Sequence, residues 1–343
     1  MNLLDQAFQA LRTVRWLRLA AAPILSAAIL LGAALSTADR AVAQEYPTRN
    51  IEVIVPYGAG SSTDTVLRVV LDSLSTSLGK QLVPTYVPGA GGAIGGERIA
   101  RQTPDGYTIG IVAAPHASFM FLRADNKADP VKDYTPICMI GRQPIVAVIN
   151  PSFPAKNLKE FLAEVRASPG KFNFVNHAGT IEMEFLAILK LTNLNMVMVP
   201  YKGGSEGLAG LLANEVHIMA TGAASAKPLM DAGRVRAIAI TSSETFPGLV
   251  GFEHLPLLSD EVKEFKGNAA WFGLLGPAGL PAPIVQKISS ACVTSLQVGQ
   301  VRERLARLVV LPASGTPGEL RNRIASDIEN MRVQVQLTGI KPR

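Results

Sequence analysis

The residues best suited to chemistry lie in one short stretch, VPYGAGSSTD (Val55–Asp64), between an apolar run and a helix-like run. Three hydroxyl residues in succession, Ser61–Thr63, stand where that helix would begin. A strand end, a glycine turn and a helix start together point free backbone N–H groups at a ligand. A phosphate loop would place a lysine directly after its last glycine, whereas no lysine occurs here until Lys80. The stretch therefore predicts a site of amides and hydroxyls around Gly60–Thr63, suited to a carboxylate or to a polar neutral group.

Three more glycine-rich turns separate strand-like runs from helix-like runs. They are PGAGGAIGGERIA (Pro88–Ala100), NHAGT (Asn176–Thr180) and TGAAS (Thr221–Ser225). The first of them misses the dinucleotide fingerprint G-x-G-x-x-G because position 94 is isoleucine. Since ligands of open α/β sheets sit beyond the carboxyl ends of strands, several such turns in one chain favour a shared cleft.

The elements that must position these turns alternate along the chain. Helical spacing is clear after the first turn, at Leu67, Val70, Leu71, Leu74 and Leu78. This alternation predicts an α/β protein with largely parallel sheets. The apolar runs predicted as strands are Ile51–Val55, Leu82–Val87, Tyr107–Ala113, Ile145–Ile149, Phe172–Asn176, Met196–Val199, Val216–Ala220, Val235–Ile240 and Trp271–Leu275.

The N-terminal segment has the features of a signal peptide. Three arginines precede the apolar run Leu19–Leu35, and the small-x-small pattern Ala41–Ala43 follows it. Cleavage near Ala43 is expected to release a protein of 300 residues into the periplasm. An uncleaved membrane anchor is the alternative, but a run of this length is marginal for a span and contains Pro23.

Charge and composition exclude several classes of partner. The formal net charge of +6 falls to +4 without the leader, and the mature part has no cluster of lysines and arginines. A small, dispersed excess of positive charge is typical of a solvated surface, so no nucleic-acid partner is expected. Four histidines stand far apart with no metal-ligand spacing, so we expect neither a metal nor a cofactor.

The two cysteines, Cys138 and Cys292, each lie in an apolar context far from the leader. No lipid attachment site follows the leader as a result. Buried free thiols are the favoured interpretation, although a disulfide could form in an oxidising compartment.

The order of these loops resembles the solute receptors of tripartite tricarboxylate transporters, often called the Bug family. The motifs cover nearly the whole mature chain. They are YPTRNIEVIVPYGAGSSTD (Tyr46–Asp64), PGAGGAIGGERIARQTPDGYTIG (Pro88–Gly110), DPVKDYTPI (Asp129–Ile137), NPSFPAKNLKEF (Asn150–Phe161), VPYKGG (Val199–Gly204), DAGRVRAIAIT (Asp231–Thr241) and WFGLLGPAGLPAPIVQKI (Trp271–Ile288).

The resemblance implies a two-lobed periplasmic-binding-protein-like fold, a Venus flytrap with a double crossover near Val146–Asn150 and Ala270–Leu274. Residues 1–43 would be the signal peptide, 44–147 with 271–343 the first lobe, and 148–270 the second. It also implies a monomer that captures a small organic carboxylate and delivers it to a permease with large and small membrane subunits. The family's site, which uses backbone amides, hydroxyls and ordered waters, would comprise Tyr57, Gly58, Ala59, Gly60, Ser61, Ser62, Thr63, Asp64, Gly91, Gly92, Ala93, Asn176, His177, Ala178, Gly179, Thr180, Thr221 and Gly222.

Two departures from the family pattern bear on the ligand. The first loop has Ala59, Gly60 and Ser61 where Pro and then Gly-Gly are usual. Glu184 falls at a position that is usually histidine. A carboxylate there would disfavour an anionic ligand if it faced the cleft, and it would be unremarkable if it were a solvated residue on a helix.

Two rival functions are considered. The segment GGSEG (Gly203–Gly207) fits the G-x-S-x-G pattern of serine hydrolases, and Asp231 and His254 follow in an allowed order. However, Ser205 comes too far after the preceding strand-like run for a nucleophile elbow. We therefore expect no enzyme activity and a nearly unchanged ligand affinity in Ser205→Ala. A soluble receptor that feeds a signalling system is the second rival, and nothing in the receptor's own sequence separates it from a transport receptor.

Overall fold

The computed structural model describes residues 46–176, 180–242, 246, 251–313, 315–339 and 341. The predicted leader and three predicted site residues, His177, Ala178 and Gly179, lie outside this range. The chain from Arg49 onward forms one compact unit, and that unit contains two β-sheets.

The first sheet combines parallel and antiparallel strands. Strand β1 runs parallel to β2 and β3, whereas β10 runs antiparallel to β3 and β4. In the order β11-β4-β10-β3-β1-β2, the strands are β11 (Leu311–Pro312), β4 (Tyr134–Gln143), β10 (Ala270–Pro277), β3 (Thr108–Ala113), β1 (Ile51–Val55) and β2 (Leu82–Tyr86).

The second sheet is also mixed. Strand β6 runs parallel to β7 and β8, whereas β5 runs antiparallel to β8 and β9. In the order β7-β6-β8-β5-β9, the strands are β7 (Val197–Pro200), β6 (Asn173–Asn176), β8 (Ile218–Gly222), β5 (Ile145–Ile149) and β9 (Arg236–Ile240).

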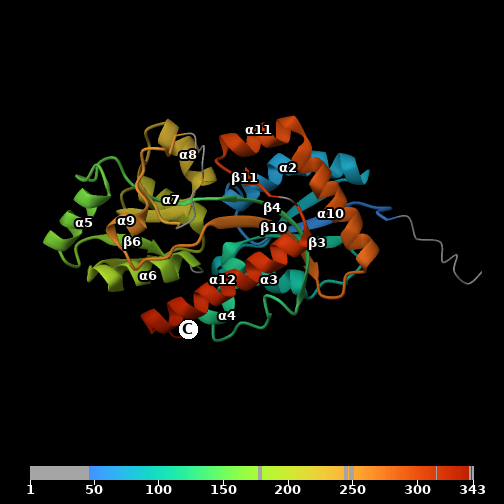
Figure 1. The fold of residues 1–343 in the computed structure, drawn as a ribbon, viewed down its shortest axis with the longest axis horizontal. Coiled ribbons are helices and arrows are strands. Elements are labelled where there is room, and N and C mark those ends of the chain that lie inside the picture. Colours follow the sequence, from blue (N-terminus) through green and yellow to red (C-terminus); the bar gives the residue numbers. More distant parts are fainter. Residues whose placement is uncertain are drawn as a thin grey trace, which may run out of the picture. The chain divides into compact units, whose positions relative to one another are not determined.

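The helices group around these two sheets (Figure 1). Helices α2, α3, α10 and α11 lie beside the first sheet, and α5 to α8 lie beside the second. The helices are α2 (Ser62–Leu78), η1 (Ala90–Gly92), α3 (Ala93–Ala100), η2 (Ala114–Ala117), α4 (Phe119–Leu122), α5 (Leu158–Ala167), α6 (Thr180–Thr192), α7 (Gly204–Leu212), α8 (Ala223–Asp231), α9 (Leu258–Glu261), α10 (Ala282–Gln297), α11 (Gly299–Arg307) and α12 (Pro317–Thr338).

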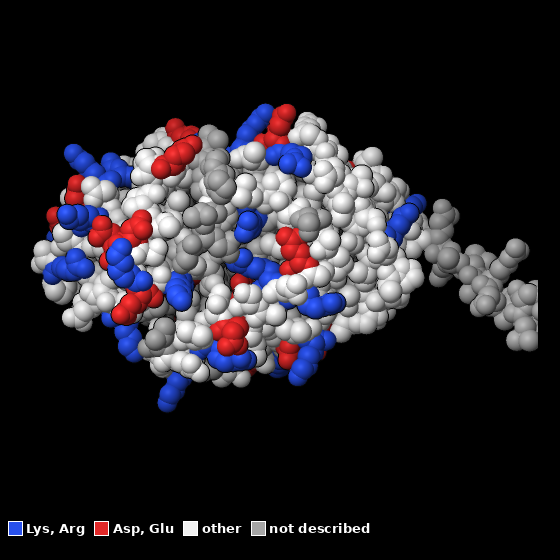
Figure 2. All heavy atoms as spheres, in the orientation of Figure 1, with Lys and Arg blue, Asp and Glu red and all other residues white. Residues whose placement is uncertain are grey.

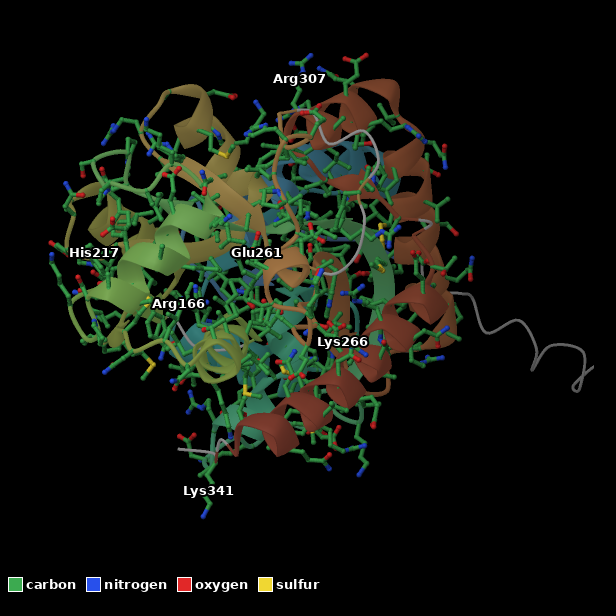
Figure 3. The ribbon with its side chains drawn as sticks, turned by 60° about the vertical axis from the view of Figure 1, so that its left-hand side comes forward. Arg166, His217, Glu261, Lys266, Arg307 and Lys341 are labelled. Atoms are coloured by element: carbon green, nitrogen blue, oxygen red, sulfur yellow. A yellow bond between two sulfur atoms is a disulfide. The ribbon has the colours of Figure 1, made fainter. Side chains whose placement is uncertain are left out.

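The chain passes between the sheets twice. Strand β4 ends at Gln143 in the first sheet, and β5 begins at Ile145 in the second, with only Pro144 between them. The chain returns to the first sheet between Ile240 and Ala270. Lys266 lies on this return segment beside α12, whose Gln334 side chain donates to the Lys266 carbonyl at 3.1 Å (Figure 3).

Helix α2 shows how local signals set up the loop before it. Its apolar residues fall at helical spacing, and all but Leu71 are buried. The side chain of Ser61 caps the start by accepting the N–H of Asp64 at 3.2 Å, and Gly79 ends the helix in the left-handed conformation, with φ of 69°. The first turn of α2 is therefore fixed at the end of strand β1.

Every run predicted as a strand is a strand, with ends within two residues of the prediction. The α/β class is confirmed, but the prediction of largely parallel sheets is wrong, because β5 and β10 both run antiparallel to their neighbours. Strands β4 and β11 were not predicted. Strand β4 pairs antiparallel with β10, and β11 lies at the edge of the first sheet. An alternation of strands and helices along the sequence does not predict strands in these positions.

The cysteines form a disulfide between Cys138 of β4 and Cys292 of α10, with 6.5 Å between the Cα atoms. The interpretation of two free thiols is therefore wrong. Both residues are buried, as expected, but α10 packs against β4 and brings together two positions that are 154 residues apart.

The described surface mixes the two signs of charge. In the view of Figure 2, Lys and Arg side chains are interspersed with Asp and Glu side chains over both groups of helices. None of the helices in the described part of the chain is long and apolar enough to cross a membrane.

Candidate functional site

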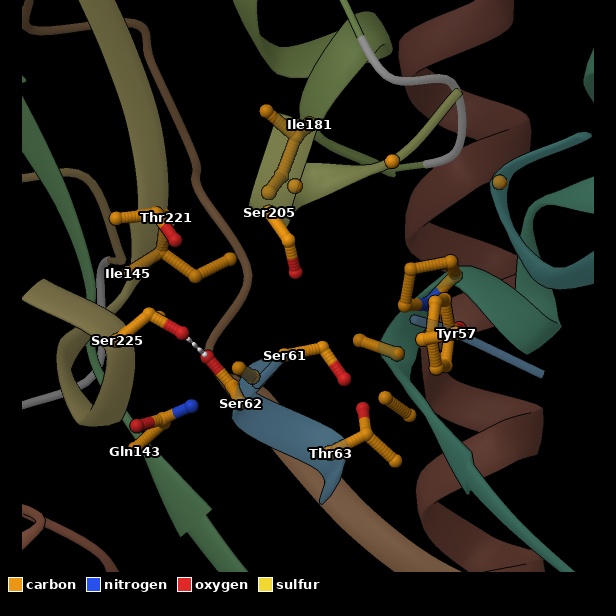
Figure 4. A pocket seen from close by; sticks show the side chains of 18 of the residues that line it. Tyr57, Ser61, Ser62, Thr63, Gln143, Ile145, Ile181, Ser205, Thr221 and Ser225 are labelled. Atoms are coloured by element: carbon orange, nitrogen blue, oxygen red, sulfur yellow. Dashed lines mark hydrogen bonds between the residues drawn. The ribbon is translucent and has the colours of Figure 1, made fainter. Parts of the chain in front are cut away.

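A cavity of about 110 Å³ lies where four helices begin. The first turns of α2, α6, α7 and α8 all reach it, and residues from both sheets complete its wall (Figure 4). It is lined by Tyr57, Gly60, Ser61, Ser62, Thr63, Gly91, Ala113, Ala114, Pro115, Gln143, Ile145, Thr180, Ile181, Gly203, Gly204, Ser205, Leu208, Thr221, Gly222, Ser225, Ala270 and Phe272.

Asp64 holds the first loop in place from outside the cavity. Its carboxylate is buried and accepts the N–H of Gly60 at 2.8 Å and the hydroxyl of Tyr86 at 2.8 Å. It also pairs with Arg68, one turn along the helix, at 3.0 Å. Asp64 does not line the cavity. The carboxylate therefore shapes the loop instead of meeting a ligand.

The loop leaves two backbone donors free. The N–H of Gly60 is donated to Asp64, and that of Ser61 to the carbonyl of Gly58 at 3.2 Å. Ser62 and Thr63 are the first two residues of α2, where a helix offers N–H groups no partner of its own. Of the amides predicted around Gly60–Thr63, only these two are free donors.

Gln143 joins the two sheets at the cavity. Its side-chain oxygen accepts the N–H of Ala224 in the first turn of α8 at 2.7 Å. Its Nε2 is buried and has no hydrogen-bond partner among the described residues, although Gln143 lines the cavity. The hydroxyl of Thr180 is buried and unpartnered in the same way. Because buried polar groups are nearly always satisfied, both atoms are expected to bond a ligand or ordered water.

A second link between the helix ends is a hydrogen bond between the hydroxyls of Ser62 and Ser225, 2.7 Å apart (Figure 4). Gly222, which precedes α8, permits this approach. A Cβ there would lie 2.9 Å from the Ser62 hydroxyl oxygen and would also clash with the Gln143 amide. The helix ends of α2 and α8 therefore meet at one side of the cavity.

The lining contains no Asp, Glu, Lys, Arg or His among the described residues. Burial raises the pKa of the Tyr57 phenol, which stays a neutral hydroxyl. Positive potential in the cavity must come from helix N-termini, each equivalent to about half a unit charge. Helix ends that keep free amides and hydroxyls can bind an anion without a formal cation.

The structure brings together half of the residues predicted for the site. Gly58 lines an adjoining cavity, and five others line neither. Gly92 supports the site indirectly, because a Cβ there would lie 2.9 Å from the Tyr57 ring. Those in the wall are Tyr57, Gly60, Ser61, Ser62, Thr63, Gly91, Thr180, Thr221 and Gly222; those outside it are Ala59, Asp64, Gly92, Ala93 and Asn176.

Several lining residues escaped the sequence prediction. Gly203, Gly204 and Ser205 belong to a turn whose glycines mark a helix start, so the signal was present. Ser225 closes a glycine-rich turn that was recognised. Gln143 carried no signal, because its place depends on β4, which was not predicted.

Neither interpretation of Glu184 is correct. The side chain is 1% exposed and does not line the cavity, so it is neither solvated nor directed at the ligand. One carboxyl oxygen accepts the N–H of Asn268 at 2.7 Å, and the other has no hydrogen-bond partner in the described structure. Burial raises the pKa of Glu184 to about 8, with a smaller contribution from Asp327.

The residues of the hypothetical hydrolase triad are not assembled. Ser205 lines the cavity as the second residue of α7, but Asp231 and His254 do not line it. Asp231 pairs with Lys227 at 2.5 Å, and His254 is exposed. Within the described ranges no group of three His, Cys, Asp or Glu residues could hold a metal ion.

Comparison with known proteins places this geometry in a family. The family model described as "Tripartite tricarboxylate transporter family receptor" matches residues 66–338 of this chain. Protein BugT of Bordetella pertussis is 30% identical over 320 residues, which cover 91% of this chain and 97% of BugT.

Solved structures agree. The periplasmic binding protein BugD is 25% identical, with a TM-score of 0.81 over 87% of this chain and 100% of that one. An R. palustris protein solved with adipate is 26% identical, with a TM-score of 0.81 and the same coverage of both chains.

Proposed function

The chain belongs to the family of tripartite tricarboxylate transporter receptors, and from this premise we propose that it captures a small organic carboxylate and delivers it to a tripartite tricarboxylate-type membrane permease. The observation that carries the proposal is the convergence of four helix N-termini on a cavity whose described lining has no ionisable group except Tyr57. A carboxylate there gains charge-assisted hydrogen bonds from the amides of Ser62 and Thr63.

Capture would involve two lobes, 44–144 with 271–343 and 145–270, that close on the ligand. The first boundary lies at 144 instead of the expected 147, because β5 begins at Ile145 in the second sheet. The two passages of the chain between the sheets support this proposal, because few segments need to change conformation. The Ser62–Ser225 hydrogen bond, which joins helices beside different sheets, would lie close to the axis of closure.

We place the mature protein in the periplasm as a monomer, with its leader removed near Ala43. The leader motif and the periplasmic relative support this location. A permease with large and small membrane subunits is the partner that the family predicts. A role in signalling would use the same site, and the neighbouring genes would distinguish the two: permease genes indicate transport.

The same geometry argues against catalysis. Ser205 has no histidine among the described residues of the cavity wall to activate it. We therefore propose a binding protein that returns its ligand unchanged.

Ser62 allows a sharp test of the site. Proline is well tolerated at the first position of a helix, and Ser61, with φ of −64° and ψ of 160°, already has the conformation that proline demands of its predecessor. Ser62→Pro removes one free amide and the hydroxyl, while the matched control Ser62→Ala removes only the hydroxyl.

The assay is calorimetry with the best carboxylate from a thermal-shift panel of mono-, di- and tricarboxylates. We expect Ser62→Pro to bind about ten- to a hundredfold more weakly than Ser62→Ala, the effect of losing one hydrogen bond to a charged acceptor. Equal affinities in the two variants would show that the amide does not hold the ligand. Stabilisation by cationic or neutral ligands alone would refute the carboxylate.

A further inference from the structure

A second cavity of about 260 Å³ adjoins the anion cavity. The two share five lining residues, which are Tyr57, Ser61, Gly203, Gly204 and Ser205. The outer cavity adds Pro56 and Pro88 from the segments after β1 and β2, and Lys202 and Glu206 from the start of α7. The shared residues place the second cavity directly beside the first, at Tyr57 and the starts of α2 and α7.

The walls along this path are largely apolar. Apolar side chains in the wall of the inner cavity are Ile145, Ile181, Leu208 and Phe272. The outer cavity continues with proline rings and the Tyr57 ring. A hydrocarbon body is stabilised there when it leaves water. A hydroxyl or carboxyl group would lose hydrogen bonds to water wherever it faced these apolar side chains.

The free donors suffice for one carboxylate. A carboxylate offers about four acceptor positions, and the amides of Ser62 and Thr63, the Gln143 Nε2 and the hydroxyls at the helix ends can fill them. The other donors of the described inner lining, at Gly204 and Ser205 in the first turn of α7, carry no formal charge, so the inner cavity has no cation for a second carboxylate.

Charge at the outer end is balanced. Lys202 is the one cation among the described residues that line either cavity, and Glu206 is the one carboxylate. Both residues are exposed, and their formal charges cancel. The outer cavity therefore offers no net attraction to a second anionic group.

We propose that the ligand is a monocarboxylate with an unsubstituted apolar body, whose carboxylate meets the N-terminus of α2 and whose body extends past Tyr57 into the outer cavity. This inference rests on the proposed function, because it names the class of carboxylate that the site takes. It separates this chain from the relative solved with adipate, which has a second carboxylate.

Matched pairs of acids test the proposal by calorimetry on the mature protein. Hexanoate and adipate differ only in the far end of the chain, as do octanoate and suberate. We expect hexanoate to bind at least tenfold more tightly than adipate, and affinity to rise about fourfold per methylene from butanoate while the added group is buried.

Two outcomes would overturn the inference without touching the proposed function. In the first, adipate or malate binds more tightly than hexanoate, and Lys202→Met abolishes the difference. The outer cavity would then bind a second, charged group of the ligand. In the second, the affinity for monocarboxylates does not change with the length of their hydrocarbon chain. If no carboxylate of any kind binds, the proposed function itself fails.

Leu208 tests the apolar wall. Leu208 and Leu212 are both half-buried on α7 and pack against the same core, but only Leu208 lines the cavity. Leu208→Ala should weaken hexanoate about tenfold, whereas Leu212→Ala should leave the affinity unchanged despite a similar loss of stability. Equal affinities in the two variants would contradict the apolar wall.

Gly58 tests the outer cavity. A Cβ at Gly58 meets no atom within 4 Å, so Gly58→Leu would occupy part of that cavity. The octanoate-to-butanoate affinity ratio should fall at least tenfold in this variant. It should stay unchanged in Gly299→Leu, a control with equally open surroundings at the start of α11. An unaltered ratio in Gly58→Leu would exclude the outer cavity from binding.

Discussion

The buried Glu184 is expected to make the protein less stable as the pH rises. Its pKa is raised from an ordinary 4.5 to about 8, chiefly because burial disfavours the charged form. Between these values the folded protein holds a proton that the unfolded chain has lost. The stability present below pH 4.5 is therefore lost progressively until the pH passes the folded pKa.

The size of this effect follows from the two pKa values. Each pH unit inside the window lowers the free energy of unfolding by about 1.4 kcal/mol, which amounts to about 3 kcal/mol at pH 7 relative to pH 4.5. Glu184→Gln keeps an oxygen that can accept the Asn268 N–H and removes the titration. The variant should be more stable than the wild type by about 3 kcal/mol at pH 7 and about equally stable near pH 4.5.

Urea unfolding at intervals of half a pH unit, from pH 4.5 to 8, measures the free energy of unfolding of the wild type and the variants. The control is Glu303→Gln, because Glu303 is exposed on α11 and pairs only with the exposed Arg307 in the described structure. The difference between wild type and Glu184→Gln should grow with pH, and that between wild type and Glu303→Gln should not. A difference that is constant across this range would refute the assignment of a protonated Glu184.

Three further predictions concern the loop, the disulfide and the cavity wall. Asp64→Ala should destabilise the protein by about 2–4 kcal/mol and weaken carboxylate binding, because the Gly60 amide and Arg68 lose a buried partner; chemical unfolding and calorimetry check both, and a variant that binds normally would show that Asp64 does not shape the site. Reduction of Cys138–Cys292 should lower stability by up to about 5 kcal/mol, since the bridge closes a loop of 154 residues; an unchanged melting temperature with both thiols alkylated would contradict this. Ser205→Ala should weaken carboxylate binding several-fold, because Ser205 lines the cavity. The sequence alone predicted a nearly unchanged affinity. Calorimetry distinguishes the two expectations, with Ser290→Ala on α10, away from the cavity, as the control.

The strands could be predicted because each is a continuous apolar run, as in Ile145–Ile149, all five residues of which are buried. Their pairing could not, because the direction of a strand depends on where the chain re-enters a sheet. Pro144 turns the chain directly from β4 into β5, and no local pattern marks that change of sheet. The same limit hid the disulfide, which depends on the packing of α10 against β4.

The site was predictable where glycine and hydroxyl residues mark a helix start, as at Ser61–Thr63. It was not predictable where a side chain acts across the two sheets, as Gln143 does through Ala224. Glu184 shows the opposite error, since a polar residue on a helix suggests solvent, yet here the helix is covered on that side by the return segment at Asn268.

Asp64 raises an apparent conflict with anion binding, because its carboxylate lies in the first turn of the helix whose N-terminus should attract the ligand. The geometry removes the conflict in two ways. The guanidinium of Arg68 lies 3.0 Å from the carboxylate and offsets its charge. The carboxylate also accepts the Gly60 N–H and so holds the loop, while the Ser62 and Thr63 amides stay free for the ligand. A neutral residue at position 64 would remove a negative charge near the ligand, yet it would release the loop that aligns those amides. Weaker binding by Asp64→Ala would therefore show that alignment of the donors contributes more to affinity than the charge that Asp64 brings.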